Sequence, residues 1–278
     1  MSFDYDTAFG RNVGMVTRED MGRLRSFRIG IAGQGGVGGH YLIALTRMGF
    51  EKFTIMDGDT FDTSNLNRQV GATTETMGRP KVEVMREMAL AINPRVDVRT
   101  IRKMFSKETS GPFFEGIDFA INSIDYFSAA VYEALHDGAR NRGLYSITGS
   151  PFGFSTSVTM FGPESPSFVE CFGIRPEDDD VTRLGKFWNA VTPARLPHAY
   201  LPNEWLTATR PMNTNLIPAV NVCVYLATAM VCTEVLVTLL KKRPPTLAPN
   251  VIQIDLLTRA LAVTPVHTQY AIHPARDR

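Results

Sequence analysis

The feature that most constrains this chain is a glycine-rich turn set between two short apolar segments. Residues 29–32 are apolar, the turn Gly33-Gln34-Gly35-Gly36-Val37-Gly38 follows at once, and a second apolar segment at 53–56 ends at Asp57. Glycines allow a tight turn and a close approach to a phosphate, and apolar side chains recur at helical spacing between the two segments until Gly49. This order predicts strand, turn, helix and strand. We interpret it as a nucleotide pocket, because the helix start offers unpaired N–H groups to an anion and Asp57 falls where doubly wound folds place a ribose-binding carboxylate.

The turn alone does not identify the nucleotide, because G-x-G-x-x-G turns serve NAD, FAD and ATP sites. A polar cluster follows the second apolar segment, first as Met56-Asp57-Gly58-Asp59 and then as Ser64-Asn65-Leu66-Asn67-Arg68-Gln69. A dinucleotide-binding oxidoreductase has no use for that cluster. With these motifs in this order, the sequence resembles the ThiF/MoeB family, adenylating enzymes related to the ubiquitin-activating enzymes. The resemblance runs from Arg11 to about Ile147 and returns in the helix near the C-terminus.

The resemblance implies that glycine backbone and polar side chains share the binding of ATP. The glycines would bring the backbone to the phosphates, Asp57 would hold the ribose, and Asn65, Arg68 and Lys81 would clamp the triphosphate. The implied nucleotide-binding residues are Gly33, Gly35, Gly36, Gly38, Asp57, Asp59, Asn65 and Gln69. The implied catalytic residues are Arg68, Lys81, Asp125 and Arg11.

Lys81 is expected in the first turn of a helix. That helix is predicted to open within residues 76–80, with Thr76 as its cap and Pro80 in its first turn, and to end at Asn93-Pro94. A cation there opposes the helix dipole unless an anion compensates for it, and an exposed lysine is the simple alternative. The resemblance assigns Lys81 to the phosphates, because Gly78-Arg79-Pro80-Lys81 matches the G-x-x-K pattern of the family.

Asp125 follows a predicted strand at 117–121. Parallel sheets gather ligands at the carboxyl ends of their strands, and Mg²⁺ prefers carboxylate oxygens. In the family that this sequence resembles, the matching aspartate supports Mg²⁺ and is usually followed by asparagine, whereas Tyr126 follows it here. The sequence therefore predicts Asp125 as the magnesium ligand.

Arg11 lies in the N-terminal arm, residues 1–27. Without the resemblance, the arm reads as a solvated segment. In the family an arginine of this arm reaches across a dimer interface to the ATP phosphates of the other subunit, and Arg11 matches that position. The planar guanidinium suits phosphate oxygens, and the resemblance therefore implies a homodimer.

Residues 163–215 form a segment rich in proline and in loop-forming residues, with several aromatic side chains. A long connection of this kind inside a compact domain is usually functional or disordered, and the aromatics favour order. We expect a substrate-recognising insert. Its acidic run, Glu177-Asp178-Asp179-Asp180, suits either a solvated turn or a basic partner. Cys171 is a possible nucleophile by resemblance, and the alternative is a buried packing residue.

Length and composition favour one domain over residues 1–278. The resemblance implies that this domain is of the ThiF type, with a nucleotide-binding half at 28–150. The class expected is α/β, a Rossmann-like doubly wound and mainly parallel sheet with antiparallel C-terminal strands. The formal net charge of +1 gives no reason to expect nucleic acid or a membrane surface as a partner. The three cysteines lack the spacing of disulfides or of a zinc site, so no zinc is expected and a cytoplasmic location is predicted.

Residues 217–240 are apolar on every side and long enough to span a bilayer. Pro218, Asn221 and Glu234 would be costly in lipid. A helix buried in the core or in a dimer interface is therefore the favoured interpretation, and a membrane span the alternative.

The predicted reaction is the ATP- and Mg²⁺-dependent adenylation of a carboxylate with release of pyrophosphate. The acceptor would be the C-terminus of a ubiquitin-like protein or peptide, or a small carboxylic acid; the near-neutral charge weighs against tRNA. Two alternatives remain, a catalytically silent subunit that binds a ubiquitin-like protein and an NAD-dependent oxidoreductase. The second would leave Asn65, Arg68, Lys81 and Asp125 without roles.

Overall fold

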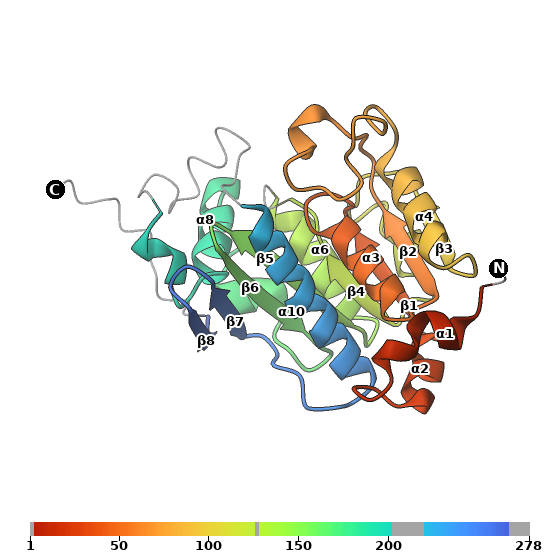
Figure 1. The fold of residues 1–278 in the computed structure, drawn as a ribbon. Coiled ribbons are helices and arrows are strands. Elements are labelled where there is room, and N and C mark those ends of the chain that lie inside the picture. The colour runs from red at the N-terminus through yellow and green to blue at the C-terminus, as the bar shows by residue number, and fades with distance from the viewer. Residues whose placement is uncertain (1–2, 126–127, 202–219, 267–278) are drawn as a thin grey trace.

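The computed structural model describes residues 3–125, 128–201 and 220–266. The chain folds around a mixed eight-stranded sheet with the order β3-β2-β1-β4-β5-β6-β7-β8 (Figure 1). The strands are β1 (Arg28–Ala32), β2 (Lys52–Met56), β3 (Asp97–Ile101), β4 (Phe119–Asn122), β5 (Tyr145–Phe152), β6 (Ser155–Phe161), β7 (Asn250–Asp255) and β8 (Ala260–Pro265). Strands β1 to β5 run parallel and β6 to β8 antiparallel, which confirms the predicted fold class.

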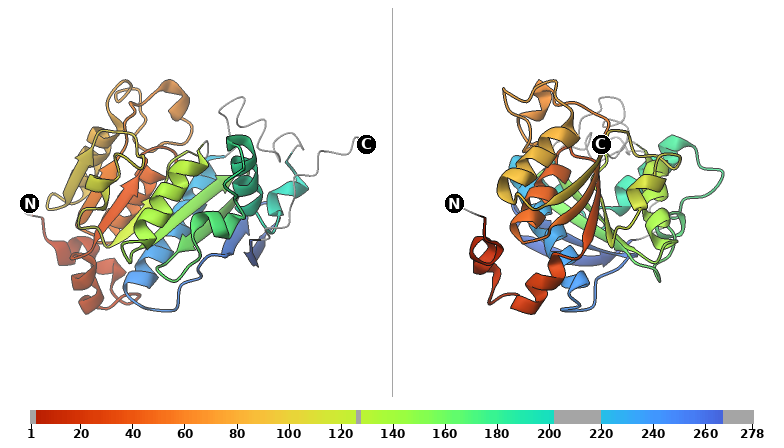
Figure 2. Two further views of the ribbon diagram at one scale, coloured as in Figure 1. Left: turned by 180° about the vertical axis from the view of Figure 1, so that it is seen from behind. Right: turned by 90° about the vertical axis from the view of Figure 1, so that its right-hand side faces the viewer.

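Helices cover both faces of the sheet. On one face lie α3 (Gly38–Arg47), α4 (Lys81–Ile92) and α10 (Asn221–Leu239), and on the other lie α5 (Gly111–Phe114) and α6 (Ala129–Arg140) (Figures 1 and 2). The parallel strands are therefore buried on both sides, which is why they read as short runs of apolar residues.

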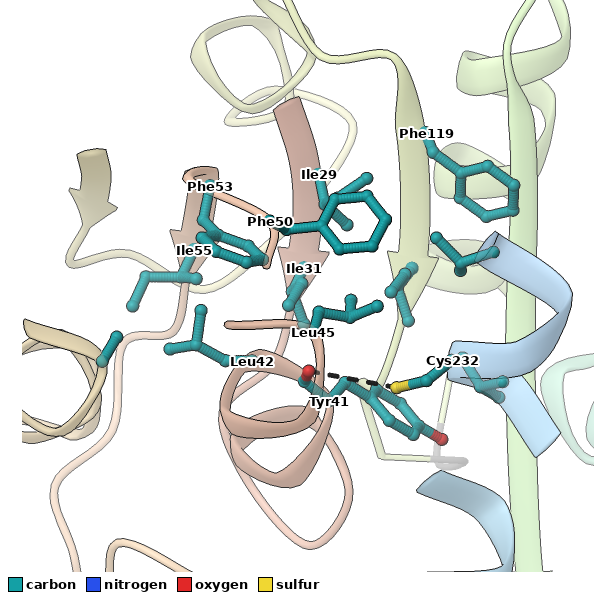
Figure 3. Close-up of a cluster of buried hydrophobic side chains, with 14 of the residues drawn as sticks. Ile29, Ile31, Tyr41, Leu42, Leu45, Phe50, Phe53, Ile55, Phe119 and Cys232 are labelled. Carbon is teal, nitrogen blue, oxygen red and sulfur yellow. Dashed lines mark hydrogen bonds between the residues drawn. The ribbon is translucent and has the colours of Figure 1, made fainter. Parts of the chain in front are cut away.

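The main core lies between β1, β2 and the helices α3 and α10 (Figure 3). Ile29 and Ile31 of β1 pack against Leu42 and Leu45 of α3, all four at 0% exposure. These α3 positions are the ones whose helical spacing the sequence showed, so this part of the core follows directly from the apolar pattern.

Helix α10 is the apolar segment for which the sequence left a membrane span open. By length and composition the 19-residue helix could cross a bilayer, yet half of its apolar window is buried inside the protein. It packs along β5 and β6 and against α3, with Cys223 and Cys232 both buried in the contact. It therefore serves this fold as a core helix, with the two cysteines as packing residues.

The N-terminal arm is folded onto the domain and is not a solvated segment. It forms α1 (Tyr5–Phe9), η1 (Gly10–Asn12) and α2 (Arg18–Leu24). The Tyr5 hydroxyl donates to the carbonyl of Gly49, 2.7 Å away, just before β2 begins. This contact places the arm at the amino ends of the parallel strands (Figure 1).

The insert has more regular structure than its sequence suggested. Within the described residues it contains α7 (Phe168–Phe172), α8 (Asp180–Ala190) and η3 (Leu196–Ala199), while positions 202–215 of the predicted insert lie outside them. The acidic run is the solvated turn that begins α8: the Asp179 side chain caps the helix and Asp178 pairs with Lys186 at 2.5 Å. Residues 168–199 thus combine three short helices with the loops expected between them.

His136 of α6 is enclosed by protein between the helix and the sheet. Only 1% of the side chain is exposed, and this burial lowers its pKa from 6.5 to about 3. The imidazole is therefore neutral over the physiological pH range.

We expect His136 to make the fold sensitive to acid. The unfolded chain takes up the proton near pH 6.5, whereas the folded chain resists protonation down to about pH 3, so stability falls as the pH falls between these values. The pKa shift of His136 corresponds to a fall of about 2 kcal/mol in the free energy of unfolding between about pH 7 and pH 5. Urea unfolding at both pH values should show this loss in the wild type and a smaller one in His136→Gln. Equal losses in the two proteins would contradict the assignment.

Candidate active site

A pocket opens at the carboxyl ends of β1, β2 and β4, as the sequence predicted. It holds about 490 Å³ of space, including its open mouth. Its lining comes from six segments that the fold brings together: Gly33, Gly35, Met56, Asp57, Asp59, Gln69, Lys81, Met104, Phe105, Ser123, Ile124 and Asp125.

The four glycines of the turn divide into two that pack against neighbouring chain and two that leave open space. Gly33 has φ of 90°, and a Cβ on Gly38 would lie 2.0 Å from the Gly33 carbonyl oxygen. A Cβ on Gly35 or Gly36 would instead make ordinary contacts of 3.6 Å with Gln69 and Arg68. Gly35 and Gly36 therefore leave the backbone accessible to a ligand, while Gly38 is required by the fold itself.

Asp57 ties the glycine turn to the end of β2. Its Oδ2 accepts the backbone N–H of Gln34 at 2.6 Å, and its Oδ1 accepts that of Asp59 at 2.8 Å. A carboxylate offers about four acceptor positions, so hydroxyl groups of a ribose could still bind to the same oxygens. Asp57 thus both shapes the turn and faces the pocket.

Lys81 is a buried cation at the first position of α4. Its side chain is 9% exposed, and its Nζ lies 3.4 Å from Asp59 Oδ2. Pro80 is the N-cap of the helix, so the predicted cap at Thr76 was wrong. Thr76 instead closes the preceding turn, where its hydroxyl donates to the carbonyl of Gly71 at 2.6 Å. An exposed lysine is excluded, and the long ion pair leaves the ammonium available to a second anion.

The segment after β2 forms η2 (Thr63–Asn65) and places Arg68 at the rim of the pocket. Asn65 Oδ1 accepts the N–H of Asp62 at 3.0 Å, so this side chain is occupied in capping the short helix. Arg68 donates to the Ser64 carbonyl at 3.1 Å and lies next to Gly36. Gln69 lines the pocket, and its buried Oε1 has no hydrogen-bond partner within the described parts of the chain.

Asp125 lines the pocket and comes three residues after the end of β4. Its side chain is solvent-accessible but sits in a concave wall, and the partial desolvation there raises the pKa of the carboxyl. Lys81 and Arg68 oppose that rise, because both cations are near enough to stabilise the charged form. The carboxylate and the two cations therefore influence one another's charge. Tyr126, which follows Asp125 where the family usually has asparagine, lies outside the described residues.

Sequence reasoning missed the apolar wall and the serine of this pocket. Met104 and Phe105 follow β3, and Ser123 and Ile124 follow β4. Each comes one to four residues after a strand end, which is the signal that could have identified them. Within the described residues, no group of three or more His, Cys, Asp or Glu side chains is arranged so that it could hold a metal ion.

Six predicted residues do not line the pocket. Four of them belong to the glycine turn and to the segment after β2 beside it: Gly36, Gly38, Asn65 and Arg68. The other two, Arg11 and Cys171, lie in other parts of the fold. Arg11 is exposed in η1, and Asn12 beside it donates to the carbonyl of Arg47 at 3.4 Å, at the opposite end of α3 from the glycine turn. Cys171 is 3% exposed in α7 among phenylalanine rings, where burial raises the pKa of its thiol to about 12. That environment favours the packing role over a thiolate nucleophile.

The model of the ThiF family matches residues 9–271, nearly the whole chain. The chain belongs to the ThiF family. This result agrees with the resemblance carried by the glycine turn and the polar cluster.

Curated relatives match part of this chain. The tRNA threonylcarbamoyladenosine dehydratase of Bacillus subtilis is 34% identical over 118 residues, which is 42% of this chain and 46% of the relative. The SAMP-activating enzyme E1 of Haloferax volcanii is 28% identical over 166 residues, 60% of this chain and 61% of the relative. The matched segment thus spans between about half and three-fifths of the length of these proteins.

Solved structures share the fold at low sequence identity. PaaA covers 96% of this chain and 75% of its own, with a TM-score of 0.67 and 16% identity. The Escherichia coli dehydratase TcdA, solved with AMP, covers 87% of this chain and 97% of its own, with a TM-score of 0.63 and 19% identity. These similarities establish the common architecture.

Proposed function

We propose that this ThiF-family protein adenylates a carboxylate with ATP. In that reaction a carboxylate oxygen bonds to the α-phosphorus, the bond between the α- and β-phosphates breaks, and pyrophosphate leaves with the electron pair. The observation that carries the proposal is the buried Lys81 ammonium, which shares with Asp125 a pocket that begins at the glycine turn and the start of α3. An oxidoreductase that uses NAD has no need for this pairing of charges.

The chain would act mainly by positioning and by neutralising charge. Gly35 and Gly36 leave the backbone open at the start of α3, where N–H groups and the helix dipole favour phosphate. Lys81, held by Asp59, and Arg68 at the rim would stabilise negative charge on the triphosphate. Asp57, which lines the pocket, would accept ribose hydroxyls, and Met104 with Phe105 gives the pocket an apolar wall.

The donor set at the edge of the pocket fits Mg²⁺. Asp125 offers carboxylate oxygens, and Mg²⁺ is usually held by one or two carboxylates together with substrate phosphates and water. When bound, Mg²⁺ would offset phosphate charge. Asp125 would hold the ion, and a bound cation would offset the desolvation that raises the pKa of its carboxyl.

A homodimer is part of the proposal because Arg11 cannot serve its own pocket. Its segment η1 lies at the amino ends of the strands, whereas the pocket lies at their carboxyl ends. An exposed arginine at that place suits a contact with the phosphates of a neighbouring subunit. We also retain the predicted cytoplasmic location, in which the three free cysteines would stay reduced.

The acceptor is proposed to be a protein or peptide C-terminus or a small carboxylic acid. Among the matched proteins are a SAMP-activating enzyme and Escherichia coli MccB, which was solved with MccA. We treat residues 1–278 as one domain and assign recognition of the acceptor to the insert at 163–215. Its helices α7 and α8 pack against α6, on the face of the sheet opposite α3 and α10.

ATP–pyrophosphate exchange tests the proposal directly. The panel of acceptors contains ubiquitin-like proteins, glycine-ended peptides and small carboxylic acids. We expect exchange that depends on one acceptor class, is lost in Lys81→Met and is kept in Lys52→Met. Lys52 is a suitable control because it is an exposed lysine at the opposite end of β2.

Other results would separate the alternatives. Binding of Mg²⁺-ATP without exchange by any acceptor would indicate a silent subunit. Stabilisation by NAD and not by Mg²⁺-ATP would overturn the proposal. The effect is large enough to measure, because a ligand at 100 times its Kd raises the free energy of unfolding by about 2.7 kcal/mol.

A further inference from the structure

A buried hydrogen-bond network lies directly beneath the turn that carries Asp125. Asn122, at the end of β4, is 0% exposed, and its Oδ1 accepts the backbone N–H of Ile124 at 3.1 Å. Its Nδ2 lies 3.4 Å from Nε2 of His136. The other imidazole nitrogen, Nδ1, lies 2.9 Å from the Ser146 hydroxyl, and Thr148 Oγ1 lies 2.9 Å from Nε2.

The chemistry of these groups determines where the imidazole proton lies. The Ile124 N–H can only donate, so the Asn122 oxygen must face it and the Asn122 NH₂ must face His136. Since that NH₂ also only donates, Nε2 must be the unprotonated nitrogen. Nδ1 then carries the proton and donates to Ser146, and the Thr148 hydroxyl at 2.9 Å shares the single lone pair of Nε2 with the longer contact from Asn122. Burial favours the neutral ring that this pattern requires.

The turn above this network is also tied to the glycine turn. The Ser123 hydroxyl lies 2.8 Å from the carbonyl of Ala32 and 2.7 Å from that of Gly33. The segment from Asn122 to Asp125 is therefore held from below by the network and from the side by the end of β1. Both the carboxylate and the phosphate-facing backbone depend on its shape.

We propose that His136, as the neutral Nδ1-protonated imidazole, is a positioning residue for the adenylation site, acting through Asn122 on the turn that presents Asp125 to the pocket. This inference rests on the proposed function. His136 does not line the pocket, so its effect is one of geometry, and a displacement of about 1 Å near a reacting group can cost about 10²-fold in rate.

A pair of variants of similar shape tests the role. Glutamine at position 136 keeps an oxygen that can accept from Asn122, whereas methionine has nearly the same length and lacks that acceptor. We expect His136→Gln to keep the kcat of exchange within about threefold, and His136→Met to lower it by about 10-fold to 10²-fold with an unchanged KM for ATP. Equal kcat values in the two variants, or losses that only follow their melting temperatures, would overturn the proposal.

A second measurement does not depend on the reaction. Long-range ¹H–¹⁵N NMR of the wild-type protein should show the proton of His136 on Nδ1, and a proton on Nε2 would overturn the proposal whatever the acceptor. If the wild type binds Mg²⁺-ATP but exchanges pyrophosphate with no acceptor, the proposed function fails separately. The Mg²⁺ dependence of ATP binding then decides the role of His136: the methionine variant should weaken it and the glutamine variant should not.

Discussion

Replacement of Asp125 by alanine is expected to lower ATP–pyrophosphate exchange by about 10²-fold to 10³-fold, the size of effect seen when a charge-stabilising group is removed from an active site. The carboxylate is the proposed magnesium ligand and lies within the electrostatic reach of Lys81 and Arg68. Its loss should leave the fold intact, because the turn below it is held by Asn122 and Ser123. Exchange rates at saturating acceptor, measured over a range of Mg²⁺ concentrations, provide the test.

Glu115→Ala is the control for this variant. Glu115 is an exposed carboxylate that follows α5 and precedes β4, and it does not line the pocket. It should retain the wild-type rate and Mg²⁺ dependence. If Asp125→Ala also exchanged pyrophosphate at the wild-type rate, the assignment of the magnesium ligand would be wrong.

The glycine turn gives a second large effect, in which two similar substitutions should behave differently. In Gly38→Ala the new Cβ would lie 2.0 Å from the Gly33 carbonyl oxygen and 2.4 Å from the Ser123 hydroxyl. Backbone cannot move away as a flexible side chain can, so the free energy of unfolding should fall by about 3 kcal/mol, the upper part of the usual range for overpacking. Urea unfolding measures the loss.

Gly36→Ala is the partner for that comparison. Its Cβ would lie 3.6 Å from Arg68 Nε, an ordinary contact, so the unfolding free energy should change by less than about 1 kcal/mol. The added methyl group would nevertheless face the space assigned to phosphate, and stabilisation by Mg²⁺-ATP should decrease. Equal destabilisation by the two alanines would contradict the division of the turn into packing and ligand-facing glycines.

Sequence patterns were sufficient where structure is determined locally. The strand, turn and helix from Arg28 to Arg47 follow from an apolar run, glycines and helical spacing, and the structure has them within one residue of the prediction. The placement of Lys81 in a first turn was also correct, although the cap was assigned wrongly. Thr76 satisfies the usual sequence rule for a cap, but its hydroxyl is used in a turn that brings the chain back to Gly71.

Long-range contacts account for what the sequence could not show. The apolar positions of α8, such as Leu184 and Phe187, are spaced as in a helix but are flanked by prolines and acidic residues, which suggested a loop. Gly38 was read as a phosphate-facing glycine, because only the fold brings Ser123 against it. His136 had no visible partner in the sequence, since Asn122 and Ser146 come from two different strands.

The N-terminal arm gives the proposed dimer an unusual division of labour between its copies. Because Arg11 and Lys81 lie at opposite ends of the same chain's sheet, each complete site would combine the arm of one copy with the pocket of the other. A chain that lacks Arg11 and a chain that lacks Lys81 would then complement each other. In every mixed dimer, one site would receive both intact residues and the other site would receive neither.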